Sequence, residues 1–171
     1  MDFYRIGIIF VMSNTSFYTL YKLKQWEKVT FYTVLEENDN KQLLWFYHFL
    51  EKINEEDKRA IKSLIKKMGT RFGAKEYFFR HEGEAHALPS TKVHFVELHN
   101  DLRLYCLRVN EHAVVLFGGG YKDARSAQDS RISYEFYLAN TMARKIRKAM
   151  KTNEIRLTPD MRLDWDKDLL L

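Results

Sequence analysis

Two apolar stripes at helical spacing, joined by about three residues, constrain the fold of this chain more than any other feature of its sequence. The stripes consist of Leu43, Trp45, Phe46, Tyr47, Phe49 and Leu50, and then of Ile61, Leu64, Ile65 and Met68. Asp39 with Gln42 has the spacing of a capping box and predicts the start of the first helix. Asn54 with Asp57 predicts the start of the second, and Gly69 ends it. A link this short requires an antiparallel helix hairpin packed by its two stripes.

Segments rich in β-branched and aromatic residues predict strands on both sides of this helix pair. They are residues 28–35 before it and residues 93–98, 102–109 and 113–117 after it. Tight turns join the last three, which is typical of an antiparallel meander. Residues 73–90 carry no such pattern and are expected to be irregular, and a final amphipathic helix follows residue 133. The predicted fold class is α+β: an N-terminal strand and a helix hairpin packed on a curved antiparallel sheet, with a C-terminal helix.

Composition excludes several classes of protein. The chain has 171 residues, which suits one domain, and its single cysteine rules out an intramolecular disulfide framework and a multi-cysteine zinc site. That residue, Cys106, is expected in the core. The histidines lack the spacing of a zinc-binding helix, so no metal and no other cofactor are expected. No apolar run approaches about 18 residues, so no membrane-spanning helix is expected, and the chain is predicted to be cytoplasmic.

Three segments are expected along the chain. Residues 28–151 hold the predicted elements and form the folded domain, and residues 152–171 form an acidic C-terminal tail. Residues 1–27 form an N-terminal extension with an apolar run at residues 6–12. This run is interpreted as an extra strand, with a signal peptide or an upstream start codon as the alternatives.

Charge is distributed along the chain in blocks. Lysine and arginine total 28 against 23 aspartate and glutamate, and residues 58–80 contain eight basic residues and one acidic residue. Residues 144–151 form a second basic cluster. Basic blocks interleaved with aromatics, as at residues 77–79, are typical of nucleic-acid binders, whereas the alternative is a solvated helix face with the aromatics in the core. The predicted RNA-binding residues are Arg71, Lys75, Arg80, His81 and Arg125.

Residues 102–122 carry a more specific pattern. A strand with Arg103 and Tyr105 is followed by a turn and by an apolar strand that ends in glycine, and Tyr121 and Lys122 come directly afterwards. In its element order, and in residues 93–122 in particular, the chain resembles the RelE/ParE superfamily of bacterial toxins, and most closely the HigB-like, phage-derived branch. The resemblance extends over residues 30–150.

The resemblance implies a RelE-like fold and a toxin of a type II toxin–antitoxin system. Members are typically ribosome-dependent endoribonucleases that cut mRNA and are silenced by an antitoxin, so the implied partners are mRNA, the ribosome and a cognate antitoxin protein. Arg103 matches the strand arginine that contacts the scissile phosphate, and Lys122 matches the lysine after the last strand. The chain departs from the family where members often have His-Gly-Phe, because it has Phe117-Gly118-Gly119 there.

The chemistry of metal-free RNA cleavage defines roles for these residues. The 2′-OH must lose a proton, the phosphorane must be stabilised, and the leaving 5′-oxygen must gain a proton. Arg103 suits the second task, and Tyr105 shares its strand face. Lys122 and Tyr121 are the expected acid–base assistants. His81 and His86 lie in the irregular segment, and one of them is a further acid–base candidate, the alternative being a solvated loop histidine.

Structural alternatives accompany each role. Arg103 could instead pair with Glu97 or cap a sheet edge, and the glycine triplet at residues 118–120 could be a bulge. A hydrolase that cleaves mRNA is therefore the leading hypothesis. The alternative function is a non-enzymatic RNA-binding, regulatory or phage-defence interaction protein on the same scaffold.

Overall fold

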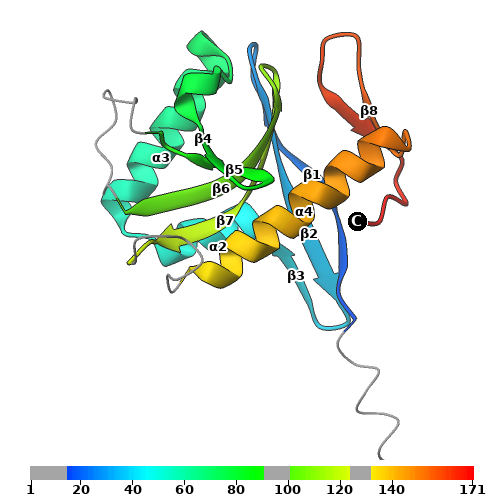
Figure 1. The fold of residues 1–171 in the computed structure, drawn as a ribbon, viewed down its shortest axis with the longest axis horizontal. Helices are drawn as coiled ribbons and strands as arrows, with labels where there is room; N and C mark the ends of the chain where they lie inside the picture. The colour runs from blue at the N-terminus through cyan, green and yellow to red at the C-terminus, as the bar shows by residue number, and fades with distance from the viewer. Residues whose placement is uncertain (1–14, 91–100, 124–131) are drawn as a thin grey trace, which may run out of the picture.

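The computed structural model describes residues 15–90, 101–123 and 132–171, and Figure 1 shows their α+β arrangement. The larger sheet has the strand order β1-β2-β7-β6-β5-β4, with β3 also paired to β2, and β8 pairs with β9 in a second sheet. The strands are β1 (Phe17–Gln25), β2 (Thr30–Asn38), β3 (Lys41–Leu44), β4 (Arg80–Glu82), β5 (Ala85–Leu88), β6 (Leu102–Asn110), β7 (Ala113–Tyr121), β8 (Ile155–Leu157) and β9 (Leu163–Trp165). The helices are α2 (Trp45–Lys52), α3 (Glu55–Lys67) and α4 (Ser133–Lys151), with a π-helical turn (Met68–Phe72) and a 3₁₀ turn (Glu76–Phe78) after α3.

The predicted all-antiparallel arrangement is wrong at the centre of the sheet, because β2 runs parallel to β7. The other strand pairs of the described residues are antiparallel. Turn residues reveal the direction of strands that are neighbours along the chain, whereas the helix hairpin and four strands separate β2 from β7. No local pattern therefore indicates their relative direction. The α+β class and the C-terminal helix are confirmed.

The helix hairpin begins at a different residue from the predicted one. The expected start at Asp39 is wrong, since this residue lies in the turn of the β2–β3 hairpin and α2 begins at Trp45. Aspartate and asparagine favour tight turns as strongly as helix starts, so the same residues suit both. At α3 the structure has the predicted cap: the Asn54 side chain accepts a 2.8 Å hydrogen bond from the backbone N–H of Asp57.

The stretch predicted to be irregular, residues 73–90, contains two short strands. β4 and β5 form a hairpin that turns at Gly83, where φ is 72°, a conformation that favours glycine. β5 then pairs with β6 and places Ala87 opposite Tyr105. Strands of three and four residues are too short to show an alternating pattern. The predicted strand at residues 93–98 lies outside the described residues.

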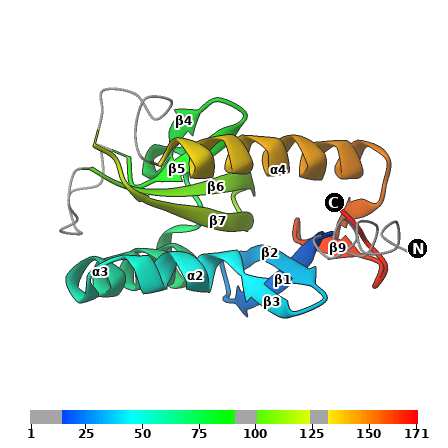
Figure 2. The same cartoon turned by 90° about the horizontal axis from the view of Figure 1, so that it is seen from below.

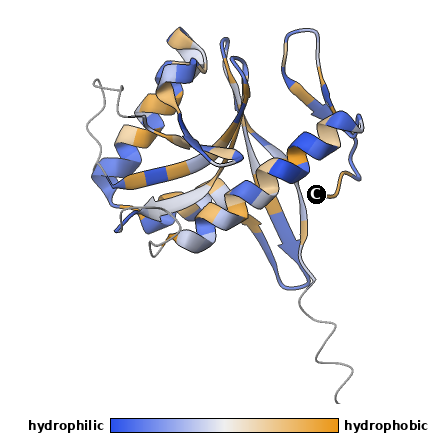
Figure 3. Ribbon diagram, in the orientation of Figure 1, coloured by the Kyte–Doolittle hydropathy of each residue, from blue (hydrophilic) through white to orange (hydrophobic). Residues whose placement is uncertain are grey.

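Helices cover both faces of the sheet, with α2 and α3 on one side and α4 on the other (Figure 2). Neighbouring residues of a strand alternate between the two hydrophobic cores. Phe31 packs in the core beneath the helix hairpin, and Tyr32 packs in the core beneath α4. In β6, Leu104 and Cys106 face the hairpin and Tyr105 faces α4. Figure 3 shows apolar and polar residues alternating along α4, as expected of a helix with one buried side.

The segments on either side of residues 28–151 also take part in the fold. β1 pairs with β2 along its length, from Phe17 opposite Glu37 to Gln25 opposite Thr30. The C-terminal hairpin β8–β9 contributes Ile155 and Leu163 to the core beneath α4, and Leu169 after it packs in the same core. Within the described residues, no helix is long and apolar enough to cross a membrane.

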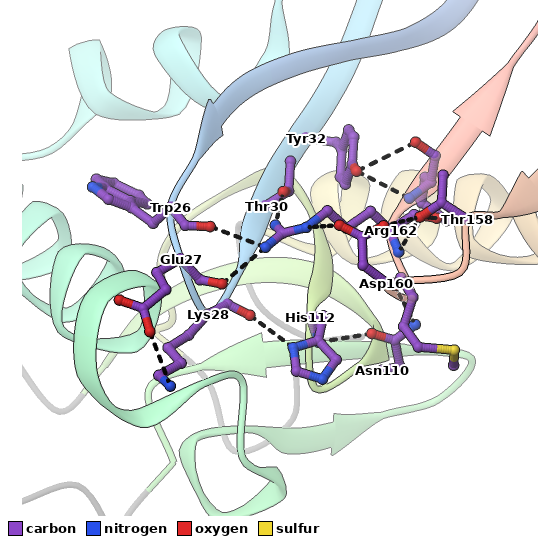
Figure 4. Close-up of polar contacts among 12 residues, drawn as sticks. Trp26, Glu27, Lys28, Thr30, Tyr32, Asn110, His112, Thr158, Asp160 and Arg162 are labelled. Atoms are coloured by element: carbon purple, nitrogen blue, oxygen red, sulfur yellow. Dashed lines mark hydrogen bonds and ion pairs between the residues drawn. The ribbon is translucent and has the colours of Figure 1, made fainter.

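Arg162 attaches the β8–β9 hairpin to the start of β2 (Figure 4). Its Nη2 donates to the backbone carbonyls of Trp26 at 3.1 Å and Glu27 at 2.9 Å, and its Nη1 donates to the Thr30 hydroxyl. Its Nε donates to Asp160 at 2.9 Å, and only 13% of the side chain is exposed. One guanidinium thus joins segments more than a hundred residues apart in sequence.

We expect Arg162→Ala to lower the free energy of unfolding by about 2 kcal/mol, because two carbonyls and a hydroxyl lose their charged donor. Urea denaturation followed by circular dichroism measures the loss. Arg156→Ala is the matched control, since Arg156 lies in the same hairpin but bonds to exposed Asp164 and Asp166 and to the nearby Asn153 carbonyl. Equal losses in both variants would contradict an anchoring role for Arg162.

Candidate nucleic-acid interface

A surface hollow of about 640 Å³ lies beside the edge strand β4, and several of the predicted RNA-binding residues line it. Its lining consists of Lys75, Glu76, Tyr77, Phe79, Arg80, His81 and Ser90. Three of these were predicted to contact RNA: Lys75, Arg80 and His81. We refer to this site as the β4 hollow.

The aromatic residues 77–79 divide between the core and the surface. Phe78 and Phe79 are buried in the core beneath the helix hairpin, whereas Tyr77 is 42% exposed. The 3₁₀ turn that carries Tyr77 is held against Ser90, whose backbone N–H donates to the Phe78 carbonyl at 2.7 Å and whose hydroxyl donates to the Tyr77 carbonyl. Tyr77 therefore presents its ring at the surface on a backbone that the core and Ser90 hold in place.

The basic residues of the β4 hollow differ in how firmly the protein holds them. The Arg80 guanidinium donates from Nε and Nη2 to the Pro89 carbonyl, at 2.9 and 2.6 Å. Burial, together with nearby Arg103, lowers the pKa of Arg80 below its ordinary value. Lys75 forms an ion pair with Glu111, and His81 is exposed beside the ring of His86, with 5.2 Å between centroids.

Arg103 and Tyr105 lie on the same face of β6, but the structure buries both. Arg103 is 7% exposed, donates from Nη1 to the Leu102 carbonyl at 2.8 Å, and has its Nε 3.9 Å from Glu82. Tyr105 is fully buried, its ring packs edge-on against Phe136, and its hydroxyl has no hydrogen-bond partner among the described residues. Burial and then Glu82 raise the pKa of Tyr105 well above its usual range, so the phenol is protonated at neutral pH.

Tyr121 lies on the opposite side of the sheet from Tyr105. Its hydroxyl donates to Asp57 at 2.6 Å and accepts from the Asn54 side chain at 2.9 Å, so it supports the N-terminus of α3. Burial and the hydrogen bond to Asp57 raise its pKa. Lys122, directly after the same strand, donates its backbone N–H to the Asp101 carbonyl. The structure therefore does not bring Tyr121 together with Arg103 and Tyr105.

The remaining predicted residues lie apart from this cluster. Arg71 is exposed in the π-helical turn, with its guanidinium 5.2 Å from the Phe72 ring centroid. Arg125 and Glu97, the alternative partner of Arg103, lie outside the described residues. Cys106 is buried, and burial raises the pKa of its thiol, so it is not an activated nucleophile. The described residues contain no group of three His, Cys, Asp or Glu side chains placed to hold a metal ion.

Protein-family models, curated proteins and solved structures give no match to this chain. The residues of the β4 hollow are therefore interpreted from their own geometry.

Sequence reasoning missed two residues that shape the hollow, Tyr77 as an exposed ring and Ser90 as its support. The sequence does indicate that one of the aromatic residues 77–79 is exposed, because three consecutive aromatics cannot all point to one side of an extended or 3₁₀ segment. Ser90 gave no signal, since its role depends on a hydrogen bond to residues more than ten positions earlier.

The glycine triplet of β7 forms an irregularity against β6, which agrees with the bulge interpretation. The register shifts between the partners of Leu104 and Cys106, and Gly119 lies directly opposite Leu104. A Cβ at Gly119 would overlap the carbonyl oxygen of Arg103, whereas a Cβ at Gly118 would meet no atom within 4 Å. Close approach of two backbones therefore requires glycine at position 119 only.

We expect Gly119→Ala to destabilise the protein by more than about 2 kcal/mol, because β6 and β7 must separate to admit the methyl group. Gly118→Ala is the matched control and should change stability by less than about 1 kcal/mol. Thermal and urea denaturation of the two variants measure the difference. A tolerated Gly119→Ala would show that this strand pair has more freedom than the geometry indicates.

His86 predicts an acid-dependent loss of stability. Its Nδ1 accepts the Arg108 backbone N–H at 3.2 Å, which requires the neutral ring, and burial followed by the charge of His81 lowers its pKa from 6.5 to about 4. The unfolded chain therefore binds the proton more readily, and the stabilisation present above pH 6.5 is lost as the pH falls toward 4.

His86→Asn retains an acceptor but cannot be protonated in this range. When the pH falls from 7 to 4, we expect the free energy of unfolding of the wild type to decrease by about 2 kcal/mol more than that of His86→Asn. Urea midpoints across this range measure it. A difference that does not depend on pH would contradict the burial of a neutral His86.

Proposed function

We propose that this protein is a RelE/HigB-like toxin that binds single-stranded mRNA in the β4 hollow and cleaves it. Under this proposal it acts in the cytoplasm, on mRNA at the ribosome, and an antitoxin protein silences it. The order from β2 through the helix hairpin to β6, β7 and α4 supports the scaffold, because these elements belong to the order on which the resemblance rests.

The observation that carries the proposal is the presence of an exposed aromatic ring and basic side chains in one hollow. Tyr77 offers a platform on which a base can stack, an interaction that contributes about 1–3 kcal/mol and tolerates any sequence. Arg80 and Lys75 supply positive charge for phosphates, and His81 lies next to Arg80 on β4. Exposed Arg144, Lys145, Lys148 and Lys151 on α4 give a further basic surface for ribosomal RNA.

His81 is the acid–base residue that this geometry favours. It is exposed, whereas Tyr105 is buried and Tyr121 is hydrogen bonded to Asp57. As a base it would take the 2′-OH proton, so that the 2′-oxygen attacks the adjacent phosphorus and a 2′,3′-cyclic phosphate forms. The bond to the 5′-oxygen breaks, and the proton that His81 took passes to that oxygen, directly or through water, so that it leaves as a hydroxyl.

A non-enzymatic RNA-binding protein is the second candidate, and one observation favours it. Arg103, which the resemblance assigns to the phosphate, and Tyr105, which shares its strand face, are covered by the fold rather than open at the β4 hollow. A protein with this hollow and with no group over the scissile phosphate would hold RNA without cutting it.

Tyr77→Ala and His81→Gln separate the two candidates. We expect Tyr77→Ala to weaken binding of fluorescein-labelled oligouridine by about tenfold through loss of stacking. We expect His81→Gln to keep most of the affinity and to abolish both growth arrest on induced expression and the new mRNA ends detected by primer extension.

Tyr137→Ala and His48→Gln are the matched controls, since both residues lie away from the hollow and Tyr137 is 56% exposed. Wild-type protein that binds oligouridine but leaves mRNA intact and growth normal supports the second candidate. Wild-type protein that neither binds RNA nor arrests growth overturns both. Salt dependence of the affinity indicates how many phosphates are neutralised.

A further inference from the structure

A second groove, on the other side of the sheet from α4, has a different chemistry from the β4 hollow. It has a volume of about 350 Å³ and lies between the β1–β2 hairpin and the helix hairpin. Its lining consists of Leu23, Lys24, Trp26, Phe31, Phe46, Tyr47, Lys62, Ile65, Lys66 and Leu116. We refer to this site as the lysine-rimmed groove.

The floor of the lysine-rimmed groove is apolar and belongs to the core. Phe31, Phe46 and Ile65 are less than a tenth exposed and pack together in the core beneath the helix hairpin. Leu23 and Trp26 are partly buried at its edge, on the chain that leads from β1 to β2. The groove is thus a depression into the main core, with a firm base on which apolar side chains can pack.

Its rim carries only positive charge. Lys24, Lys62 and Lys66 are exposed, and within the described residues none of them forms an ion pair with a carboxylate. Lys62 and Lys66 are four positions apart on α3, so their like charges repel each other. Lys58, one turn earlier, differs in that Glu55 pairs with it at 2.6 Å.

The Trp26 ring argues against a nucleic acid as the occupant. Gly69 lies so close beneath this ring that a Cβ there would collide with it, and Lys24 Nζ lies 5.9 Å from the ring centroid. Phe31 meets the ring edge-on, at an interplanar angle of 83°. Contacts on several sides leave little of the ring face for a base to stack on, whereas aliphatic side chains pack against ring edges and methyl groups equally well.

We propose that the lysine-rimmed groove binds an acidic amphipathic segment of a partner protein. Apolar side chains of the segment would occupy the floor over Phe46 and Ile65. Its carboxylates would pair with Lys24, Lys62 and Lys66 and relieve their mutual repulsion. The groove shares no lining residue with the β4 hollow, so a partner segment and RNA have separate sites.

The test uses a fluorescein-labelled peptide of glutamate and leucine patterned as an amphipathic helix, with the lysine–leucine peptide of the same pattern as its counterpart. Fluorescence anisotropy with the full chain measures affinity. We expect the acidic peptide to bind and the double variant Lys62→Glu, Lys66→Glu to weaken it at least about tenfold. We expect Tyr47→Ala to weaken it as well, because it removes a ring from the wall.

The matched control for charge is Lys145→Glu with Lys148→Glu, which makes the same change of charge on α4. If both double variants weakened binding of the acidic peptide equally, the proposal would be overturned, because the peptide would then be attracted by the overall positive charge and not by the groove. Failure of the acidic peptide to bind also overturns the proposal. A third contrary result is weaker binding of oligouridine by the Lys62→Glu, Lys66→Glu variant alone, because it would show that the groove binds RNA. Cleavage of RNA by that variant reports on the proposed function separately, so either inference can fail alone.

Discussion

Four residues of β2, Thr30–Thr33, pair in parallel with residues 113–116 of β7, and all of these residues are buried. This parallel pairing joins the N-terminal hairpins to the strands that follow the helices, so both cores depend on it. The Thr33 hydroxyl adds to it, because it donates to the Leu116 carbonyl at 2.7 Å and accepts the Phe46 backbone N–H at 3.1 Å. The same side chain therefore joins β2 to β7 and fixes the first turn of α2 over the sheet.

The sequence predicted best those elements whose signals are local and long. The apolar stripe and the Asn54 cap predicted α3, because one periodic face of this helix contacts the core. Apolar runs joined by a tight turn predicted β6 and β7, which are buried on both faces. Asp39 and the β4–β5 hairpin were predicted wrongly, since turn residues and very short strands leave little pattern. The direction of β2 relative to β7 depends on residues about 80 positions apart, which no local signal records.

The candidate site was predicted in part for the same reason. Residues grouped along the chain, such as Lys75, Arg80 and His81, lie around one hollow because a short turn and a short strand carry them. Residues grouped by alternation on β6, such as Arg103 and Tyr105, share a face, but alternation does not indicate whether that face is open. Here α4 covers it, with Phe136 against Tyr105. Whether a residue is exposed depends on tertiary packing. The exposed candidate residues therefore lie at the sheet edge, beside β4, and not on the face of β6.

The attachment of the β8–β9 hairpin to β2 has a consequence for folding. The Tyr32 hydroxyl accepts the Leu163 backbone N–H at 3.0 Å, next to the contacts of Arg162 with Trp26 and Glu27. The residues in these contacts are more than 130 positions apart, so the contact order of this region is high. The chain must lose the entropy of a long loop before the contacts form. During synthesis, residues 26–32 emerge long before their last partners. We therefore expect the start of β2 to remain open to chaperones and proteases in the nascent chain until Arg162 and Leu163 have left the ribosome.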